Sequence, residues 1–348
     1  MNTNNNRIEY IDVAKGLGIL LVILGHIVWG ENYRIPGNET ICNFIYSFHM
    51  PLFFVISGLC IKESKELTKE TFLKMIRAYL IPYVIWILIY MAVFTAVELP
   101  TGHNDLLIYQ LAHAASICGL EPLWFLLALF VAELIVIRFK KHISTKIGTC
   151  AALMLCAVVS IILSFWYESI KDGMNLFLKN WLMGLFRILP TTFFVMAGYK
   201  SKNLMNKVIK LKTIIRIAMI VLMSAVQLLL CLICNDGIDV QVYNLGNQWL
   251  YYIKALNGTA AVLIICGMIH SKALSYIGRH SKELMILHHP PFFFISTLSL
   301  LLSKLFSPNI FGALIITAAT TLFCLAIDQI MGRFRPYRFS MGKKKLNN

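Results

Sequence analysis

Runs of about twenty apolar residues recur from one end of this chain to the other. A run of that length is typical of a helix that crosses the hydrocarbon core of a bilayer, which is about 30 Å thick. The composition agrees, since 58% of the 348 residues are hydrophobic and only 14% are charged, unlike globular domains in water. The sequence therefore predicts an all-α, polytopic membrane protein. Its ten predicted spans cover approximately residues 13–30, 43–61, 77–98, 122–138, 147–166, 181–199, 213–234, 249–269, 284–302 and 308–332.

The basic residues predict the orientation of these spans. The net charge is +15, and most of the 32 Lys and Arg residues fall in alternate connections if the N-terminus lies inside. This asymmetry follows the positive-inside rule and predicts that both termini are cytoplasmic. The longest external connections are then about 100–121 and 234–248. Because the charge has this topological explanation, no nucleic-acid partner is predicted, and the basic C-terminal tail is expected to contact lipid headgroups.

The chain is expected to form a single integral-membrane domain over residues 1–348, since no connection is long enough to hold a separate soluble domain. The first apolar run lacks an A-x-A-type exit, so we expect it to remain as a span and not to be cleaved as a signal peptide. Most of the nine cysteines fall inside spans, and we interpret them as small apolar residues. Cys231 and Cys234 form a CxxC with no second pair, so no metal site is predicted.

Two histidines interrupt the first two apolar runs, His26 in the first and His49 in the second. Ionisable side chains within a membrane usually face the protein interior and often have a function. Lys15 and His26 are eleven residues apart, about three helical turns, and Asp12 lies one turn before Lys15, so the three share one face. Both imidazoles are expected at a similar depth, roughly 6–9 Å below the outer surface. Two imidazoles at one depth on adjacent helices predict a reaction site.

The same stretch resembles a known family. IDVAKGLGILLVILGH followed by FHMPLFFVISG is similar to the opening of the membrane-bound acyltransferase 3 family, which O-acylates sugars and other envelope acceptors. The commoner family pattern has Arg, ten residues and then His, whereas this chain has Lys15 before His26. That substitution resembles the branch with fucose acetylase-like and exopolysaccharide-modifying members. It keeps the charge but loses the planar guanidinium fork.

The resemblance implies a donor, an acyl-CoA that is most simply acetyl-CoA, acting as a co-substrate in place of a bound cofactor. Lys15, oriented by Asp12, is expected to face the cytoplasmic mouth where the CoA phosphates would lie. Arg77 lies in a segment similar to the family, and we interpret it as a second phosphate contact. It also fits a simple positive-inside anchor. His288 is assigned to the donor tunnel, although backbone groups freed at Pro290 and Pro291, which are predicted to kink the helix, would equally satisfy it.

Three residues are predicted to contact the acceptor. Glu121 is a carboxylate at the outer rim, and Trp124 belongs to a segment similar to the family's Trp-Phe-Leu run, although an aromatic-belt anchor explains it equally well. Arg187 lies about 9 Å inside the outer end of its span, where an arginine needs a partner. Lys254 lies at a comparable depth and has the alternative of snorkelling outward. Glu133 is expected to pair with another buried polar group.

Acyl transfer from a thioester to a hydroxyl needs a base and stabilisation of the developing oxyanion. His26 is the predicted general base, and His49 is predicted either to orient it or to stabilise the oxyanion. Because the chain has no G-x-S-x-G motif, direct transfer is preferred to a serine acyl-enzyme, with an acyl-histidine left open.

The predicted acceptor is an envelope carbohydrate or lipid-linked sugar, and the predicted location is the bacterial cytoplasmic membrane. The rival interpretation is a transporter of an amino acid or a lipid-linked saccharide, although no internal repeat is visible. Whether the protein forms homo-oligomers is left open.

Overall fold

The structure is a computed structural model that describes residues 9–30, 33, 35, 37–102, 104–234, 236–289, 294–305 and 307–343. The described residues form helices and no strand, apart from one isolated bridge between Asp239 and Asn244. The prediction of an all-α fold is confirmed. The α-helices, in chain order, are α1 (Glu9–Trp29), α2 (Glu39–Tyr46), α3 (His49–Cys60), α4 (Lys69–Met75), α5 (Ile81–Thr101), α6 (Asn104–Ala114), α7 (Trp124–Phe139), α8 (Lys146–Ile170), α9 (Leu176–Phe186), α10 (Ile188–Val208), α11 (Thr213–Ile233), α12 (Gln248–Cys266), α13 (Lys272–Arg279), α14 (Ser281–Leu287), α15 (Phe294–Leu305), α16 (Ile310–Met331) and α17 (Arg335–Ser340).

Nine helical segments within the described ranges are long and apolar enough to cross a membrane. They correspond to nine of the ten predicted spans. The remaining prediction, 284–302, covers α14 and the start of α15, which are separated by a segment that includes residues outside the description. Pro290 and Pro291 are among these residues, so the predicted kink lies outside the described part of the chain. The protein is a polytopic membrane protein.

Three of the predicted spans contain a helix break or an irregular turn at a predicted site residue. The span predicted over 43–61 is divided into α2 and α3, and α3 begins at His49. The span predicted over 181–199 is divided into α9 and α10 around Arg187. A π-helical turn, Ile76–Leu80, contains Arg77. Breaks of this kind at membrane depth are tolerated where protein or a polar cavity satisfies the freed backbone groups.

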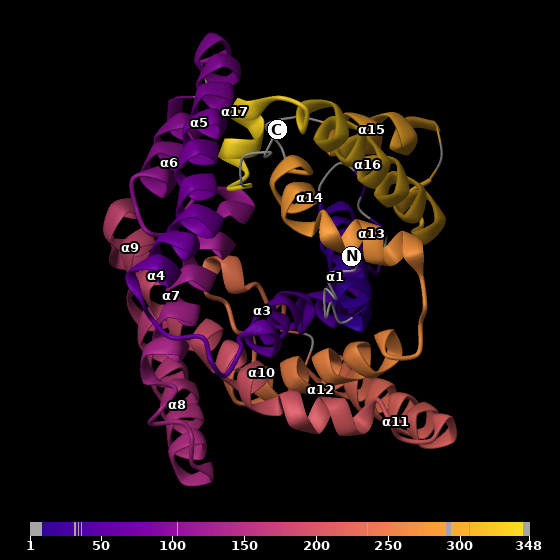
Figure 1. The fold of residues 1–348 in the computed structure, drawn as a ribbon. Helices are drawn as coiled ribbons and strands as arrows, with labels where there is room; N and C mark the ends of the chain where they lie inside the picture. Colours follow the sequence, from indigo (N-terminus) through magenta and orange to yellow (C-terminus); the bar gives the residue numbers. More distant parts are fainter. Residues whose placement is uncertain are drawn as a thin grey trace.

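The centre of the bundle is held by close approaches at glycines. A Cβ atom on Gly278 of α13 would collide with the backbone of Asp12 in α1, and one on Gly198 of α10 would collide with the backbone of Val55 in α3. Small residues allow helices to pack this closely in a membrane. Figure 1 shows the other helices arranged around α1 and α3, and α1 also contacts α12 and α16. The residues of the predicted site on α1 and α3 therefore lie inside the bundle.

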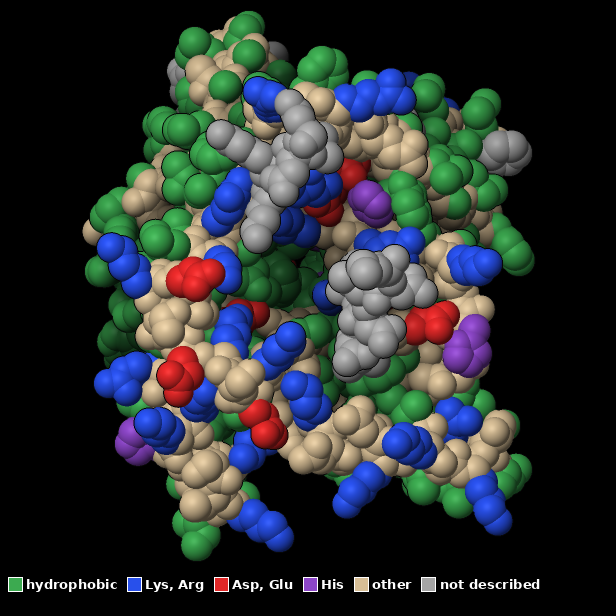
Figure 2. All heavy atoms as spheres, in the orientation of Figure 1, with side chains coloured by type: hydrophobic (Ala, Val, Ile, Leu, Met, Phe, Trp, Pro, Cys, Tyr) green, Lys and Arg blue, Asp and Glu red, His purple; other side chains and the backbone are tan. Residues whose placement is uncertain are grey.

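One face of the molecule is rich in basic side chains. Figure 2 shows Lys and Arg spread over the face on which both chain ends are marked, around a central hollow. Lys200 and Lys202 lie in the C-terminal part of α10, and Lys282 lies at the start of α14. By the positive-inside rule this is the predicted cytoplasmic face, and we call it the inner face.

Candidate active site

A cavity of about 420 Å³ extends through the interior from the inner face toward the opposite side. Lys15 and His26 of α1 both line the cavity, and they lie about 16 Å apart along the helix, so the cavity extends over that length. The middle of the cavity is apolar. Its polar lining residues are Lys15, Ser57, Tyr79, Glu133, Ser281 and Lys282 at the inner end, and His26, Tyr46, His49, Glu121, Asp239, Gln241 and His289 in the outer half.

The cavity brings together five of the nine predicted site residues. These are Lys15, His26, His49, Glu121 and Trp124. The eleven-residue spacing of Lys15 and His26 thus places both side chains on the cavity. The other four predicted residues are buried or partly buried behind the cavity wall and do not line it: Asp12, Arg77, Arg187 and His288.

His26 lies in a group of aromatic rings. The His26 ring centroid is 5.1 Å from that of His289, 5.3 Å from that of His288 and 6.4 Å from that of Tyr46. The Tyr46 ring is in turn 4.8 Å from the ring of His49. The sequence predicts His26 and His49 as neighbours, and in the structure the Tyr46 ring connects them by packing against both.

The hydrogen bonds of two rings determine which nitrogen carries the proton. His49 Nδ1 lies 2.9 Å from the Ile45 carbonyl oxygen, and His288 Nδ1 lies 2.9 Å from the Leu284 carbonyl oxygen. Because a carbonyl oxygen only accepts, each Nδ1 carries the hydrogen and donates. In the neutral rings Nε2 is then the proton acceptor, and His288 Nε2 has no partner among the described residues.

His289 is the site residue that the sequence reasoning missed. Its Nε2 lies 3.2 Å from Glu121 Oε2, and its buried Nδ1 has no partner within the described structure. Glu121 has φ 48, a left-handed conformation that is uncommon for Glu and typical of functional sites. The neighbouring residues His288 and His289 are visible in the sequence. Which of them faces the cavity depends on where α14 ends, at Leu287, and the sequence does not show this. The Glu121 carboxylate orients a second imidazole beside His26.

At the inner end, the buried carboxylate of Glu133 is fully engaged. It accepts hydrogen bonds from Ser57 and from Tyr79, the latter over 2.7 Å, and its second oxygen lies 3.4 Å from Lys65 Nζ. The prediction that Glu133 pairs with other polar groups is confirmed.

The C-terminal segment packs beside the inner end of the cavity. Arg77 Nη2 donates to the Lys343 carbonyl oxygen over 3.1 Å, and Lys282 Nζ donates to the Met341 carbonyl oxygen over 2.6 Å. Lys343 Nζ lies 3.0 Å from Glu283 and 3.3 Å from Asp328. Arg77 is thus a neighbour of the cavity mouth and is held by the end of the chain.

At the outer end, Arg187 holds the cavity wall from behind. Its side chain is 1% exposed, and its guanidinium carbon lies 4.7 Å from the centre of the Trp124 ring. The guanidinium donates to the carbonyl oxygen of Gln241 over 2.8 Å and to the carbonyl oxygens of Ile117 and Cys118. Its partners are therefore an aromatic face and three backbone carbonyls.

Comparisons with known proteins identify the family of the chain. Residues 8–329 match the acyltransferase domain family, acyltransferase 3. The chain belongs to this family. Nodulation protein NolL of Sinorhizobium fredii (strain NBRC 101917 / NGR234) is 28% identical over 166 residues, which is 46% of this chain and 44% of that protein. No solved structure matches. The family match and the apolar helices together make the protein a multi-pass membrane member of the acyltransferase 3 family.

Proposed function

We propose that this acyltransferase moves an acetyl or similar short acyl group from cytoplasmic acyl-CoA to a hydroxyl of an envelope carbohydrate or lipid-linked sugar. The observation that supports it best is the single cavity that joins a basic inner end to a group of imidazoles in the outer half. A donor with phosphates at one end and a thioester at the other fits this polarity. The acceptor hydroxyl would meet the thioester beside His26.

The donor would enter from the inner face. Lys15 and Lys282 line the cavity there, and the charges of Arg77 and Lys343 lie close to its mouth. Phosphate oxygens pair favourably with such cations. The apolar middle of the cavity would then receive the pantetheine arm and exclude water from the thioester.

Two histidines would act directly on the transfer. His26 takes the proton of the acceptor hydroxyl, the oxygen attacks the thioester carbonyl carbon, and the carbon–sulfur bond breaks to release CoA as a thiolate that is then protonated. Of the two predicted roles of His49, orienting His26 fits better, because its Nδ1–H is committed to Ile45 and its ring reaches His26 through Tyr46. The proton held by His26 returns to the thiolate, and His289, oriented by Glu121 beside His26, is the second imidazole through which it can pass.

The decisive experiment compares cells that lack the protein with cells that produce it or its His26→Ala variant. Mass spectrometry of the envelope carbohydrates is expected to show an acyl increment only with the wild type. Acetyl-CoA is also expected to bind the purified protein, more weakly as salt rises, because exposed charges are screened. A folded protein that binds no acyl-CoA at any salt concentration would support the transporter interpretation instead.

The orientation is tested separately with single cysteines. Leu106→Cys in α6, where the side chain is 42% exposed, is expected to react with an impermeant thiol reagent added to intact cells, after subtraction of the wild-type signal. Lys343→Cys is expected to react only after the cells are opened. The reverse pattern would place the basic face outside and remove the argument for a cytoplasmic donor.

A further inference from the structure

The connection between α11 and α12 forms part of the outer cavity wall. Asp239, Val240 and Gln241 line the cavity together with Glu121 and Trp124. Nothing in the sequence marks this connection as functional, because it has no apolar period and no recognisable motif. Asp239 is nevertheless a carboxylate held inside a cavity that also contains His26.

The connection is fixed by its own hydrogen bonds. Asp239 and Asn244 exchange two backbone hydrogen bonds of 2.8 and 2.9 Å, and Asp239 Oδ1 accepts from the Gln241 N–H over 2.9 Å. Tyr243 has φ 56 between them, and its hydroxyl donates to the Ser160 carbonyl oxygen over 2.8 Å. The side chains of Asp239 and Gln241 are therefore presented on a rigid turn.

Two buried cations attach this turn to the bundle. Arg187 holds the Gln241 carbonyl and, with the same guanidinium, the Cys118 carbonyl in the connection that leads to Glu121 and Trp124. It thus couples the two connections that form the outer wall. Lysine carries one donor group without the planar fork and cannot reproduce this set of contacts.

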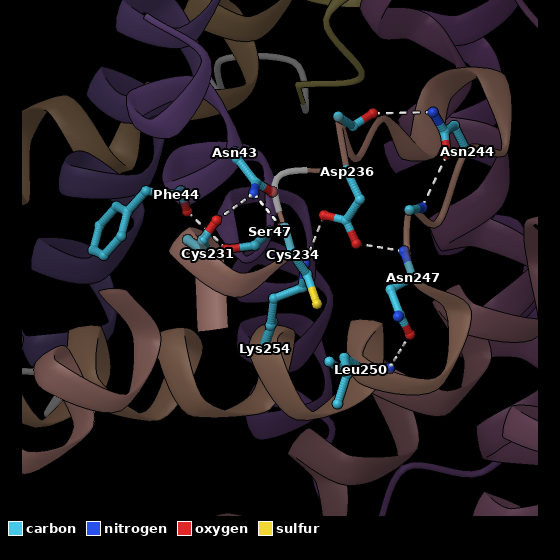
Figure 3. A network of polar contacts seen from close by, with 12 residues as sticks. Asn43, Phe44, Ser47, Cys231, Cys234, Asp236, Asn244, Asn247, Leu250 and Lys254 are labelled. Atoms are coloured by element: carbon cyan, nitrogen blue, oxygen red, sulfur yellow. Dashed lines mark hydrogen bonds and ion pairs between the residues drawn. The ribbon is translucent and has the colours of Figure 1, made fainter. Parts of the chain in front are cut away.

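Lys254 is the second cation. Its side chain is fully buried, and its Nζ lies 2.7 Å from Asp236 Oδ1 and 3.4 Å from the Cys234 carbonyl oxygen. Asp236 also accepts from the Asn247 N–H, and Asn43 Nδ2 donates to the Cys234 carbonyl oxygen over 2.6 Å (Figure 3). Lys254 does not snorkel outward. It holds the start of the connection against α12, while Asp236 joins the start to the end at Asn247 and Asn43 joins it to α2.

We propose that Asp239 and Gln241 bind the acceptor, and that Arg187 and Lys254 are positioning residues that hold them in place. This inference rests on the proposed function. A carboxylate accepts hydrogen bonds from hydroxyls, and an amide both donates and accepts. With the Trp124 ring as an apolar surface, the set fits a group that carries several hydroxyls. A negative side chain at this end also disfavours the phosphates of the donor and so separates the two substrates.

The test uses purified protein with two probes. The donor is acetyl-CoA, and the acceptor is envelope carbohydrate isolated from cells that lack the protein. Asp239→Asn and Gln241→Ala are expected to raise the acceptor KM by about 10-fold or more, the effect of losing a hydrogen bond to a charged or well-placed group. The KM for acetyl-CoA is expected to stay within about 2-fold, since no donor contact is removed.

The positioning role is tested by Arg187→Lys and Lys254→Met. Both are expected to raise the acceptor KM while the KM for acetyl-CoA stays within about 2-fold, and Lys254→Arg is expected to keep more of the acceptor affinity than Lys254→Met. The matched control is Lys171→Met, which removes an outer cation paired with Glu168 at the surface. A general loss of structure would instead lower acetyl-CoA binding and acceptor affinity together.

The outcomes separate the two claims. Unchanged acceptor KM in both Asp239→Asn and Gln241→Ala would overturn the inference, and so would an equal loss of acetyl-CoA binding in these variants. A wild-type protein that binds no acetyl-CoA would overturn the proposed function, and this inference with it.

Discussion

The two ends of the cavity are held together by different interactions. At the inner end, lysine side chains pair with carboxylates while remaining partly exposed, as Lys65 does at 31% and Lys343 at 30%. At the outer end, Arg187 and Lys254 are buried, and their partners are mostly backbone carbonyls. A partly exposed lysine can keep its charge in water when its ion pair opens, whereas a buried cation that loses its partners is costly. The lysines of the inner end can therefore rearrange more easily than the two cations of the outer end.

This difference matches what each substrate would require. A donor bound through phosphates needs positive charge more than fixed geometry, because charge attraction acts over several ångströms. The reacting hydroxyl needs placement within a few tenths of an ångström, since a displacement of about 1 Å can cost about 10²-fold in rate. Substitutions at the outer end should therefore affect transfer more strongly than substitutions at the inner end.

The largest effect is expected for His26→Ala. Removing a general base typically costs about 10² to 10⁴ in rate, and His26 lines the cavity on α1, the helix that also carries Lys15. The measurement is the initial rate of acetyl transfer from acetyl-CoA to envelope carbohydrate, with membrane insertion followed in parallel. His142→Ala, at an exposed histidine on the inner face, is the control and should transfer normally.

Transfer at the wild-type rate by correctly inserted His26→Ala would reject the mechanism. It would leave His289 as the remaining candidate for the base, because Glu121 orients it.

A smaller loss, of about 10²-fold, is expected for Glu121→Gln. The amide has the shape of the carboxylate but can also donate, so it no longer imposes one tautomer on His289. Because the charge at the outer end changes while the inner end is untouched, kcat should fall with the KM for acetyl-CoA unchanged. Glu121→Asp should recover little, since shortening the side chain breaks the 3.2 Å contact. Equal kcat in wild type and Glu121→Gln would reduce the Glu121–His289 pair to a structural contact.

Much of the fold could be predicted from the sequence because apolar runs near twenty residues have few alternatives. The polytopic all-α class and the shared face of Lys15 and His26 follow from composition and from helical period alone. The interruptions could not be predicted in the same way. The break at Arg187 has partners distant in the sequence, the carbonyls of Cys118 and Gln241. At the break before His49, the Ser47 hydroxyl accepts a hydrogen bond from the distant Gln227.

The site was predicted best where it lies on long helices and least where it lies on connections. Trp124 begins α7, Glu121 lies in the short 3₁₀ turn just before it, and both were predicted and line the cavity. Asp239 and Gln241 lie in a connection whose path is set by tertiary contacts. Arg187 was predicted to contact the acceptor because a buried arginine needs a partner. Its partners are backbone groups, and periodicity does not reveal them.

At the inner end, Lys15→Ala should raise the KM for acetyl-CoA about 10-fold, as expected for losing a charged hydrogen bond. Lys15→Arg should keep most of the affinity, because charge is the main requirement there. The KM of the wild type should rise with salt, and that of Lys15→Ala should rise less steeply. Identical salt dependence in the two proteins would show that Lys15 does not contact the donor.

The smallest effect is expected from the titration of Asp239, in the connection outside the spans. Burial raises the pKa of the Asp239 carboxyl to about 6, against the opposing effects of the Gln241 N–H and the positive charge of Arg187. Tyr46 on α2 and Tyr109 on α6 also interact electrostatically with it. Since the charged form accepts the stronger hydrogen bonds, acceptor affinity should be complete above pH 7 and decline as pH falls through about 6. The acceptor KM should therefore rise about 3- to 10-fold between pH 7.5 and pH 5 in the wild type and stay nearly flat in Asp239→Asn. A ratio of the two KM values that does not change with pH would show that the carboxylate does not meet the acceptor, and the contrast between the two ends would then rest on Arg187 and Lys254 alone.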